Sequence, residues 1–309
     1  MTGAAVAGVG LMTGWGAGVS ALPADARAAA GGRRVVPLPR PALAGERFRR
    51  VTRECLLGVA AVEALLRDAG LAREDIHGSG TALLYATAGA YGASNLAFVA
   101  GAAGTEHSVG GLRKERPGSV ASSTAVGAGA AGTEHSVGGL REKRGGSVAS
   151  STLHFPYTAP SAVPGEVAIE FGLTGAYEIL IGGAAATIDA LWRATELLAR
   201  GRCARALVLA VETFEECEDL YARGRWLVGA PLVESAACAL LIPGRLGAAY
   251  APALDPSPLE VLARAHAGET LACAPLIALA LAREAGDTDR ASLTGEWRRR
   301  RVGLTLEIR

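Results

Sequence analysis

The stretch Tyr177-Glu-Ile-Leu-Ile-Gly-Gly-Ala-Ala-Ala-Thr187 decides the fold of this chain. Its apolar first half stops at Gly182-Gly183, which predicts a strand followed by a tight turn. Over 187–198 the apolar residues recur at helical spacing, so that Ile188, Leu191 and Leu198 are expected to face inward. The sequence therefore predicts a strand, a glycine turn and a buried helix that ends near Ala199.

Outside this stretch, strands alternate with helices, which predicts an α/β fold with a mainly parallel sheet. Two of the strands are continuous apolar runs, as expected where helices cover both faces of a sheet. The segment 24–41 is rich in Ala, Arg and Pro and is expected to be loop with some helix. The predicted strands are Ala5–Met12, Thr81–Thr87, Ala206–Val211 and Ala236–Ile242, and a long helix is predicted at Arg50–Ala69, stopped by Gly70.

Several segments follow one another in an order that is itself informative. They are Val6-Ala-Gly-Val-Gly-Leu-Met-Thr-Gly-Trp-Gly16, the segments 48–76, 81–89, 154–166 and 166–211, and Leu232-Val-Glu-Ser-Ala-Ala-Cys-Ala-Leu-Leu-Ile242. Together they resemble the β-ketoacyl-ACP synthases, over residues 4–243 with the stretch 100–152 excepted. The resemblance implies a thiolase-like layered α/β fold, formed by residues 1–309 as a single domain.

In that family, the segment that resembles 166–211 carries the nucleophilic cysteine. A strand delivers the thiol to the N-terminus of a buried helix, where the helix dipole and backbone N–H groups favour a thiolate and a developing oxyanion. The resemblance places Ala184 at the cysteine position. Alanine has no atom that can attack a thioester, so we expect no catalytic residue here. The alternative is that an unrelated α/β protein contains a similar strand, turn and helix.

The C-terminal part departs from the family pattern. Residues 244–309 are too few for a full second half with its two histidines and a lysine, and a His-Gly-Thr-Gly-Thr stretch is absent from the sequence. The segment at His266 resembles the family's Gly-His-Thr segment, but Glu269 replaces the histidine. We therefore expect a shortened C-terminal half that ends in a strand at 302–308.

This combination most resembles the chain-length-factor-type subunits, which lack the catalytic cysteine. The resemblance implies a heterodimer with an active ketosynthase, an acyl carrier protein as second partner, and a place in fatty acid or polyketide biosynthesis without autonomous condensing activity. One alternative is a ketosynthase-like acyltransferase or malonyl-thioester decarboxylase that works without a cysteine, with Glu269 as acid or base. Another is a decaying paralogue that keeps the fold without a role.

Three side chains after the strand at 81–87 are candidates for shaping an acyl pocket. Tyr91, Asn95 and Phe98 are spaced by four and then three residues, which places them on one face of a helix over 90–100. In chain-length-factor-type relatives, the corresponding helix crosses the dimer interface and closes the acyl tunnel. Ordinary core or interface packing is the alternative for all three residues.

A tandem repeat occupies the stretch 100–152. Residues 100–124 and 128–152 are nearly identical and differ at three positions, which are Lys114/Glu142, Glu115/Lys143 and Pro117/Gly145. Two copies do not make a solenoid. We expect a Gly-, Ala- and Ser-rich loop insertion that arose by local duplication, rather than a dedicated function.

Composition excludes several classes of function. Lys+Arg 31 against Asp+Glu 30 argues against nucleic-acid binding, because such proteins are basic. The chain has no apolar run of about 18 residues that suggests a membrane span. The five cysteines are odd in number and form no CxxC pair, which indicates a reduced, cytoplasmic protein.

Cofactor and metal signatures are weak. The spacing of Gly8, Gly10 and Gly14 differs from a dinucleotide fingerprint, and metal-ligand spacing is absent, so we expect no cofactor. A hidden pair of a thiol with His154 or His266 is disfavoured. The run Arg298–Arg301 fits either an acidic carrier protein or, as the favoured interpretation, a solvated loop or strand edge.

Overall fold

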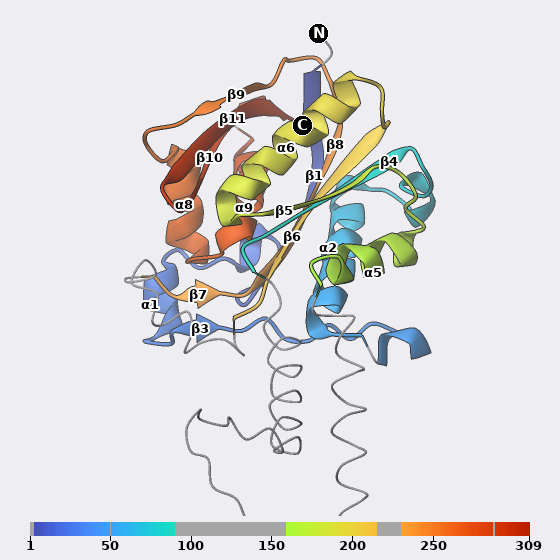
Figure 1. Ribbon diagram of the computed structural model, residues 1–309. Coiled ribbons are helices and arrows are strands. Elements are labelled where there is room, and N and C mark those ends of the chain that lie inside the picture. The colour runs from blue at the N-terminus through green and yellow to red at the C-terminus, as the bar shows by residue number, and fades with distance from the viewer. Residues whose placement is uncertain (1–2, 50, 90–158, 215–229, 287) are drawn as a thin grey trace, which may run out of the picture. The chain divides into compact units, whose positions relative to one another are not determined.

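A mixed β-sheet in the order β10-β11-β1-β8-β6-β4-β5 forms the centre of the unit that the structure describes (Figure 1). The computed structural model describes residues 3–49, 51–89, 159–214, 230–286 and 288–309. All of them belong to one unit, made of Met1–Ala93 and Ala159–Arg309. The strands of the sheet are β1 (Gly3–Thr13), β2 (Gly16–Ala17), β4 (Thr81–Thr87), β5 (Tyr177–Ile181), β6 (Arg205–Glu212), β8 (Ser235–Gly244), β9 (Ala249–Pro252), β10 (Arg290–Trp297) and β11 (Arg300–Ile308), and β3 (Val35–Val36) pairs with β7 (Leu232–Val233) apart from it.

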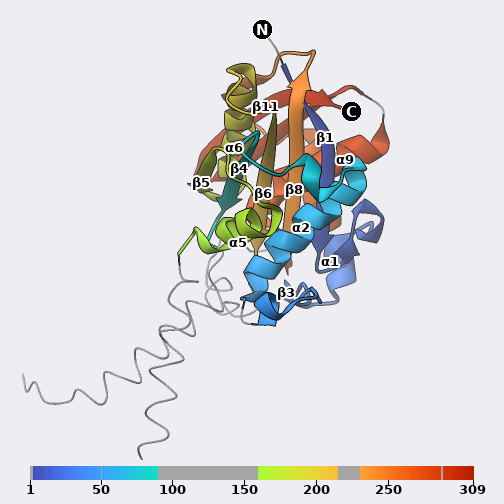
Figure 2. The same ribbon diagram turned by 90° about the vertical axis from the view of Figure 1, so that its right-hand side faces the viewer.

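Helices cover both faces of the sheet. The helices are α1 (Ala26–Ala30), α2 (Arg53–Ala69), α5 (Ala162–Phe171), α6 (Gly183–Ala199), α8 (Pro258–Ala267) and α9 (Ala274–Ala285), with a 3-10 turn η7 (Leu271–Cys273) before α9. Figure 2 shows α2 and α5 in front of one face, and α6 and α9 pack on the other. The predicted α/β fold class is thus confirmed.

The side chains of single strands show how both faces of the sheet are covered. In β4, Ala82, Leu84 and Ala86 belong to the core cluster that contains α6. Leu209 of β6 points the opposite way, where a Cβ on Gly58 of α2 would lie 3.7 Å from its side chain. Both strands are almost wholly buried, as the continuous apolar run 206–211 predicted for β6.

The long N-terminal helix begins later than predicted. Thr52 is extended and precedes α2, while a separate 3-10 turn occupies Glu46–Arg49, so the helix starts at Arg53 instead of residue 50. Its end is as predicted: Gly70 adopts φ 64°, and its N–H donates to carbonyls of the last turn. This left-handed position suits glycine because it carries no Cβ.

The expectation of a mainly parallel sheet is wrong in part. β4 pairs in parallel with β5 and β6, and β1 pairs in parallel with β11, but β8 lies antiparallel to both β1 and β6. The cause is where the chain returns to the sheet. Ser235 pairs with Glu212, so β8 begins beside the point where β6 ended and must run back along it.

The C-terminal part extends the same sheet. β11 adds to the edge of β1, and β10 and β9 pair with β11 on its two sides. The sheet curls, so that α6 packs against both its central strands and the β10–β11 hairpin (Figure 1). The predicted strand at 302–308 is therefore confirmed within β11, whereas β10 was not predicted.

Candidate functional site

The candidate site is the turn between β5 and α6. β5 ends at Ile181, Gly182 precedes the helix, and α6 begins at Gly183. The Gly182 N–H donates to the carbonyl oxygen of Thr87 at 2.9 Å, which fixes the turn to the end of β4. The predicted strand, turn and helix are confirmed, and Ile188, Leu191 and Leu198 are buried as expected.

Ala184 lies in the first turn of α6 and is partly buried. The first N–H groups of an α-helix have no partner within the helix, so this position suits a developing negative charge. The turn reads Gly183-Ala-Ala-Ala, and the first hydroxyl along α6 is that of Thr187. Thr187 is buried and donates to the Ala272 carbonyl at 2.6 Å, so its oxygen is committed to η7. The equivalence of Ala184 with a catalytic cysteine stays a prediction.

The β10–β11 hairpin covers this turn. A Cβ on Gly183 would lie 2.4 Å from Cε3 of Trp297, so the indole ring rests directly on that residue. A Cβ on Gly295 would lie 2.5 Å from the Ala184 carbonyl oxygen, so the β10 backbone also touches the first turn. Gly183 has φ 55°, a conformation in which side chains are strained.

An apolar cluster completes the wall beside the turn. Four buried residues form this cluster, which are Val35, Phe214 after β6, Leu232, and Leu271 in η7. Trp297 is partly buried and packs against them. Leu271 has φ 46°, which is unusual for a residue with a branched side chain. The site is therefore lined mainly by hydrocarbon.

One buried carboxyl group lies at the end of β6. Glu212 accepts a hydrogen bond from the Ala88 N–H at 2.6 Å, and the Ala272 N–H also faces it. Burial raises the pKa of the Glu212 carboxyl to about 8, against the smaller lowering effect of these N–H groups. The group is therefore mostly protonated at neutral pH.

A second buried carboxylate is held by an arginine. Arg53 donates through both terminal nitrogens to the two carboxylate oxygens of Glu234, each at 2.8 Å. The backbone N–H groups of Leu38 and Phe214 donate to the same carboxylate at 2.8 Å and 2.6 Å. This bidentate pair ties the start of α2 to β8 and to the segments around it. We did not predict this ion pair. Its signal in the sequence was Glu234, a charged residue within the apolar run 232–242.

Several predicted residues have structural partners. His266 shares a hydrogen bond through Nδ1 with the carbonyl of Pro23 at 2.8 Å. Glu269 pairs with Arg264 at 3.3 Å and accepts from the Leu271 N–H at 3.2 Å, while burial raises the pKa of its carboxyl. The Glu269 carboxylate therefore already has two partners.

The arginine run is divided between two roles. Arg300 forms an ion pair with Asp189 of α6 at 2.6 Å, and Arg301 pairs with Glu260 of α8 at 2.7 Å. Arg298 and Arg299 form the two-residue hairpin turn with φ 48° and 71°, and both are exposed. The run is therefore a turn followed by the start of β11, and half of it anchors the hairpin.

The thiols in the described residues are buried. Cys55, Cys203, Cys238 and Cys273 are free, and burial raises the pKa of the Cys55 thiol to about 12. Burial also raises the pKa of Cys238 and of Cys273. Such thiols are poor nucleophiles. Across the described ranges, no group of three or more His, Cys, Asp or Glu side chains is arranged to hold a metal ion.

The remaining candidates lie outside the described residues. These are Tyr91, Asn95 and Phe98, His154 and the repeat 100–152. Among the helices that the structure describes, none is both long and apolar enough to cross a membrane.

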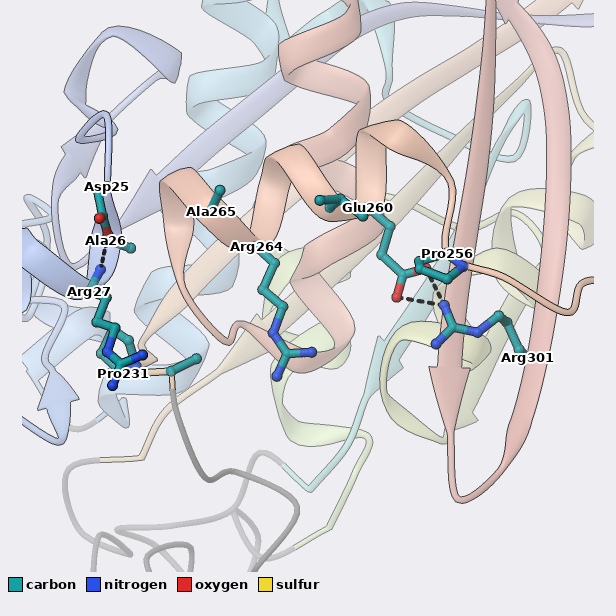
Figure 3. A pocket seen from close by; sticks show the side chains of 11 residues that line it. Asp25, Ala26, Arg27, Pro231, Pro256, Glu260, Arg264, Ala265 and Arg301 are labelled. Atoms are coloured by element: carbon teal, nitrogen blue, oxygen red, sulfur yellow. Dashed lines mark hydrogen bonds and ion pairs between the residues drawn. The ribbon is translucent and has the colours of Figure 1, made fainter.

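A pocket of about 370 Å³ lies elsewhere, between α1, α8 and β11 (Figure 3). Its wall contains the Glu260–Arg301 ion pair, and Arg264, which pairs with Glu269, also lines it. Asp25 of this pocket accepts hydrogen bonds from the first N–H groups of α1. The charges around the pocket are thus mostly balanced by partners within the chain.

Comparison with known proteins identifies the fold. No family model matches the sequence, and no curated protein matches it either. Among solved structures, "The ishigamide ketosynthase/chain length factor" superposes with a TM-score of 0.64 at 15% identity, over 98% of each chain. The AntDE:AntF complex of a type II polyketide ketosynthase with its acyl carrier protein gives 0.69 at 12% identity, over 100% of each chain.

A β-ketoacyl synthase from Burkholderia phymatum STM815 gives a TM-score of 0.64 at 15% identity, also over 100% of each chain. At these identities, the likeness shows the fold alone. The chain therefore has the thiolase-like fold of ketosynthases and chain-length-factor subunits, as the sequence predicted.

Proposed function

We propose that this chain is a non-catalytic, chain-length-factor-like subunit that pairs with an active ketosynthase in the cytoplasm. In fatty acid or polyketide biosynthesis it would complete the acyl pocket of that partner, which receives its substrate from an acyl carrier protein. The observation that supports this proposal is the first turn of α6, which reads Gly183-Ala-Ala-Ala after a strand and a glycine turn. Ala184, which the resemblance places at the nucleophile position, has no atom that can attack a thioester.

The exposed edge of the sheet supports the proposal that this chain pairs with another protein. Among the described strands, β5 is the last on its side, and Tyr177 and Ile181 at its two ends are 42% and 59% exposed. Ile169 on the neighbouring α5 is 69% exposed. A strand edge with free backbone groups and apolar side chains is suited to pairing with another chain. Solved structures with this fold include complexes described as a ketosynthase with its chain length factor.

Co-expression with the ketosynthase encoded nearest to this chain tests the proposal. We expect a stoichiometric heterodimer, and Ile181→Lys should reduce its yield by about tenfold or more, because lysine protects a strand edge from pairing. Leu254→Lys is the matched control, since Leu254 is 95% exposed in the loop before α8 and lies away from β5. A chain that forms a stable homodimer and ignores every ketosynthase offered would overturn the proposal.

The same preparation tests the alternative enzyme activity. Release of CO₂ from a malonyl carrier protein by this chain alone would favour a decarboxylase. Because Glu269 is held by Arg264 and by the Leu271 N–H, we expect no release above background.

A further inference from the structure

The first turn of α6 is covered by the chain itself. The Trp297 ring approaches both residues before Ala184: a Cβ on Gly183 would lie 2.4 Å from Cε3, and a Cβ on Gly182 would lie 3.6 Å from Cδ1. Both glycines are buried, and Trp297 is half-buried between the main core and the cluster around Phe214. A large rigid ring thus lies against the two glycines at the N-terminal end of α6, beside Ala184, which is itself partly buried.

The close approach of the hairpin depends on glycine. Gly295 lies two residues before Trp297, and any side chain there would meet the backbone of Ala184 at 2.5 Å. With glycine at positions 182, 183 and 295, backbone and ring come together without an intervening Cβ. The covering of the turn is therefore encoded at three positions of the sequence.

Ion pairs on both sides clamp the hairpin. On one side, Arg300 holds Asp189 of α6 through two hydrogen bonds of 2.6 and 2.9 Å, and the Tyr250 hydroxyl donates to Asp189 at 2.6 Å. On the other side, Arg301 holds Glu260 of α8. A segment anchored to two helices is not easily displaced by a ligand.

We propose that Trp297 excludes acyl thioesters from the N-terminus of α6, so that position 184 of this chain is closed to substrate. On this view the chain departs from an active ketosynthase twice, by losing the nucleophile and by filling the space in front of it. The further consequence, that in a complex the thioester reacts at the partner's site and not at position 184, rests on the proposed function.

A reporter thiol at position 184 tests this directly. In the variant Ala184→Cys, a thiol at a helix N-terminus would have a lowered pKa and react rapidly with iodoacetamide if it were accessible. We expect its labelling to be about tenfold or more slower than that of Ser292→Cys, an exposed position on β10. Adding Trp297→Ala should raise the rate at position 184 by about tenfold or more, because the covering ring is gone.

Two controls keep the outcome unambiguous. Arg299→Ala changes the same turn at an exposed side chain and should leave the rate at position 184 unchanged. Peptide mapping reads Cys238 and Cys273 in the same sample, and these wholly buried thiols stay unlabelled only while the fold is intact. If Trp297→Ala exposes them, Trp297→Phe replaces it and should give an intermediate rate.

Fast labelling of Ala184→Cys with Trp297 in place would overturn the inference, as would a rate that does not respond to either Trp297 variant. The measurement is made on the full chain, alone and in complex. A failed co-purification therefore counts against the proposed function, whereas fast labelling counts against the covering role of Trp297.

Discussion

Burial of the Glu212 side chain determines the pH at which its carboxyl group loses a proton. Its pKa is raised to about 8, whereas in an unfolded chain it is about 4.3. At a pH below both pKa values, the carboxyl group is neutral in the folded and in the unfolded chain, so its ionisation does not affect the free energy of unfolding. Between them only the unfolded chain is ionised, so stability falls by about 1.4 kcal/mol per pH unit until the folded pKa is passed.

We therefore predict that Glu212→Gln becomes progressively more stable than the natural chain as pH rises from about 5 to 8, with no further change above that. Thermal melting at several pH values measures the difference between the two curves, which removes the other titrating groups. Parallel curves would contradict a buried, protonated Glu212.

Glu307 provides a control of opposite sign. It accepts hydrogen bonds from the backbone of Arg245 and Leu246, and these bonds with the neighbouring Arg309 lower the pKa of its carboxyl. Its contribution is present above the unfolded pKa and is lost as pH falls through the folded value. Glu307→Gln should thus cost stability at neutral pH, and the difference should disappear in acid.

The sequence located some of these residues and not others. Ala184 was placed correctly at a helix start, because the strand, Gly182-Gly183 and the helix are adjacent in the chain. The burial of Glu212 was not predicted, because its partners come from β4 and η7, far away in the sequence. A glutamate at the end of an apolar run looks like an ordinary strand boundary.

At the scale of elements, the β10–β11 hairpin decides how close the sheet comes to α6. Gly295 of β10 and Gly303 of β11 lie on neighbouring strands of this hairpin but meet different surroundings. A Cβ on Gly295 would lie 2.5 Å from the Ala184 backbone, whereas one on Gly303 would find its nearest atom at an ordinary 3.5 Å.

We predict that Gly295→Ala destabilises the protein by about 1–3 kcal/mol, because the hairpin must move away from α6. Gly303→Ala is the matched control and should stay within about 0.5 kcal/mol of the natural chain. Urea unfolding midpoints compare the two variants. Equal midpoints would mean that the hairpin does not rest on α6.

Local patterns predicted most elements but not this hairpin. The strands β1, β4, β6 and β8 were predicted from their apolar residues, which form continuous runs in β6 and β8. The hairpin turn is Arg298-Arg299, with both residues at positive φ, a position where Asn-Gly is the usual signal. Without that signal, an arginine run predicts a solvated loop. The antiparallel direction of β8 was missed for a different reason, since strand direction follows from the return path of the chain.

At the scale of the whole molecule, the order of the sheet and the exposed edge bear on how the chain works. In the described residues, β11 and β10 extend the sheet on the β1 side, so that β10 and β5 are its two terminal strands. Of these two strands, β5 is the one with exposed apolar side chains, Tyr177 and Ile181, so we expect a partner to pair there. β4 pairs directly with β5, and Tyr91, Asn95 and Phe98 follow β4 in the chain. In the proposed complex, these three residues are therefore close in sequence to the strand next to the paired edge.

If Phe98 limits the acyl pocket of that complex, Phe98→Ala should lengthen the product by one or more two-carbon units, because removing the ring leaves room for further extension. Mass spectrometry of products from the reconstituted complex measures the length. The spacing predicts Tyr91 and Asn95 on the same helix face, so Tyr91→Ala and Asn95→Ala should shift the product in the same direction. Leu254→Ala, at a fully exposed site, is the control and should change nothing. An unaltered product from an intact Phe98→Ala complex would assign all three residues to interface packing, and chain length would then be set by the partner alone.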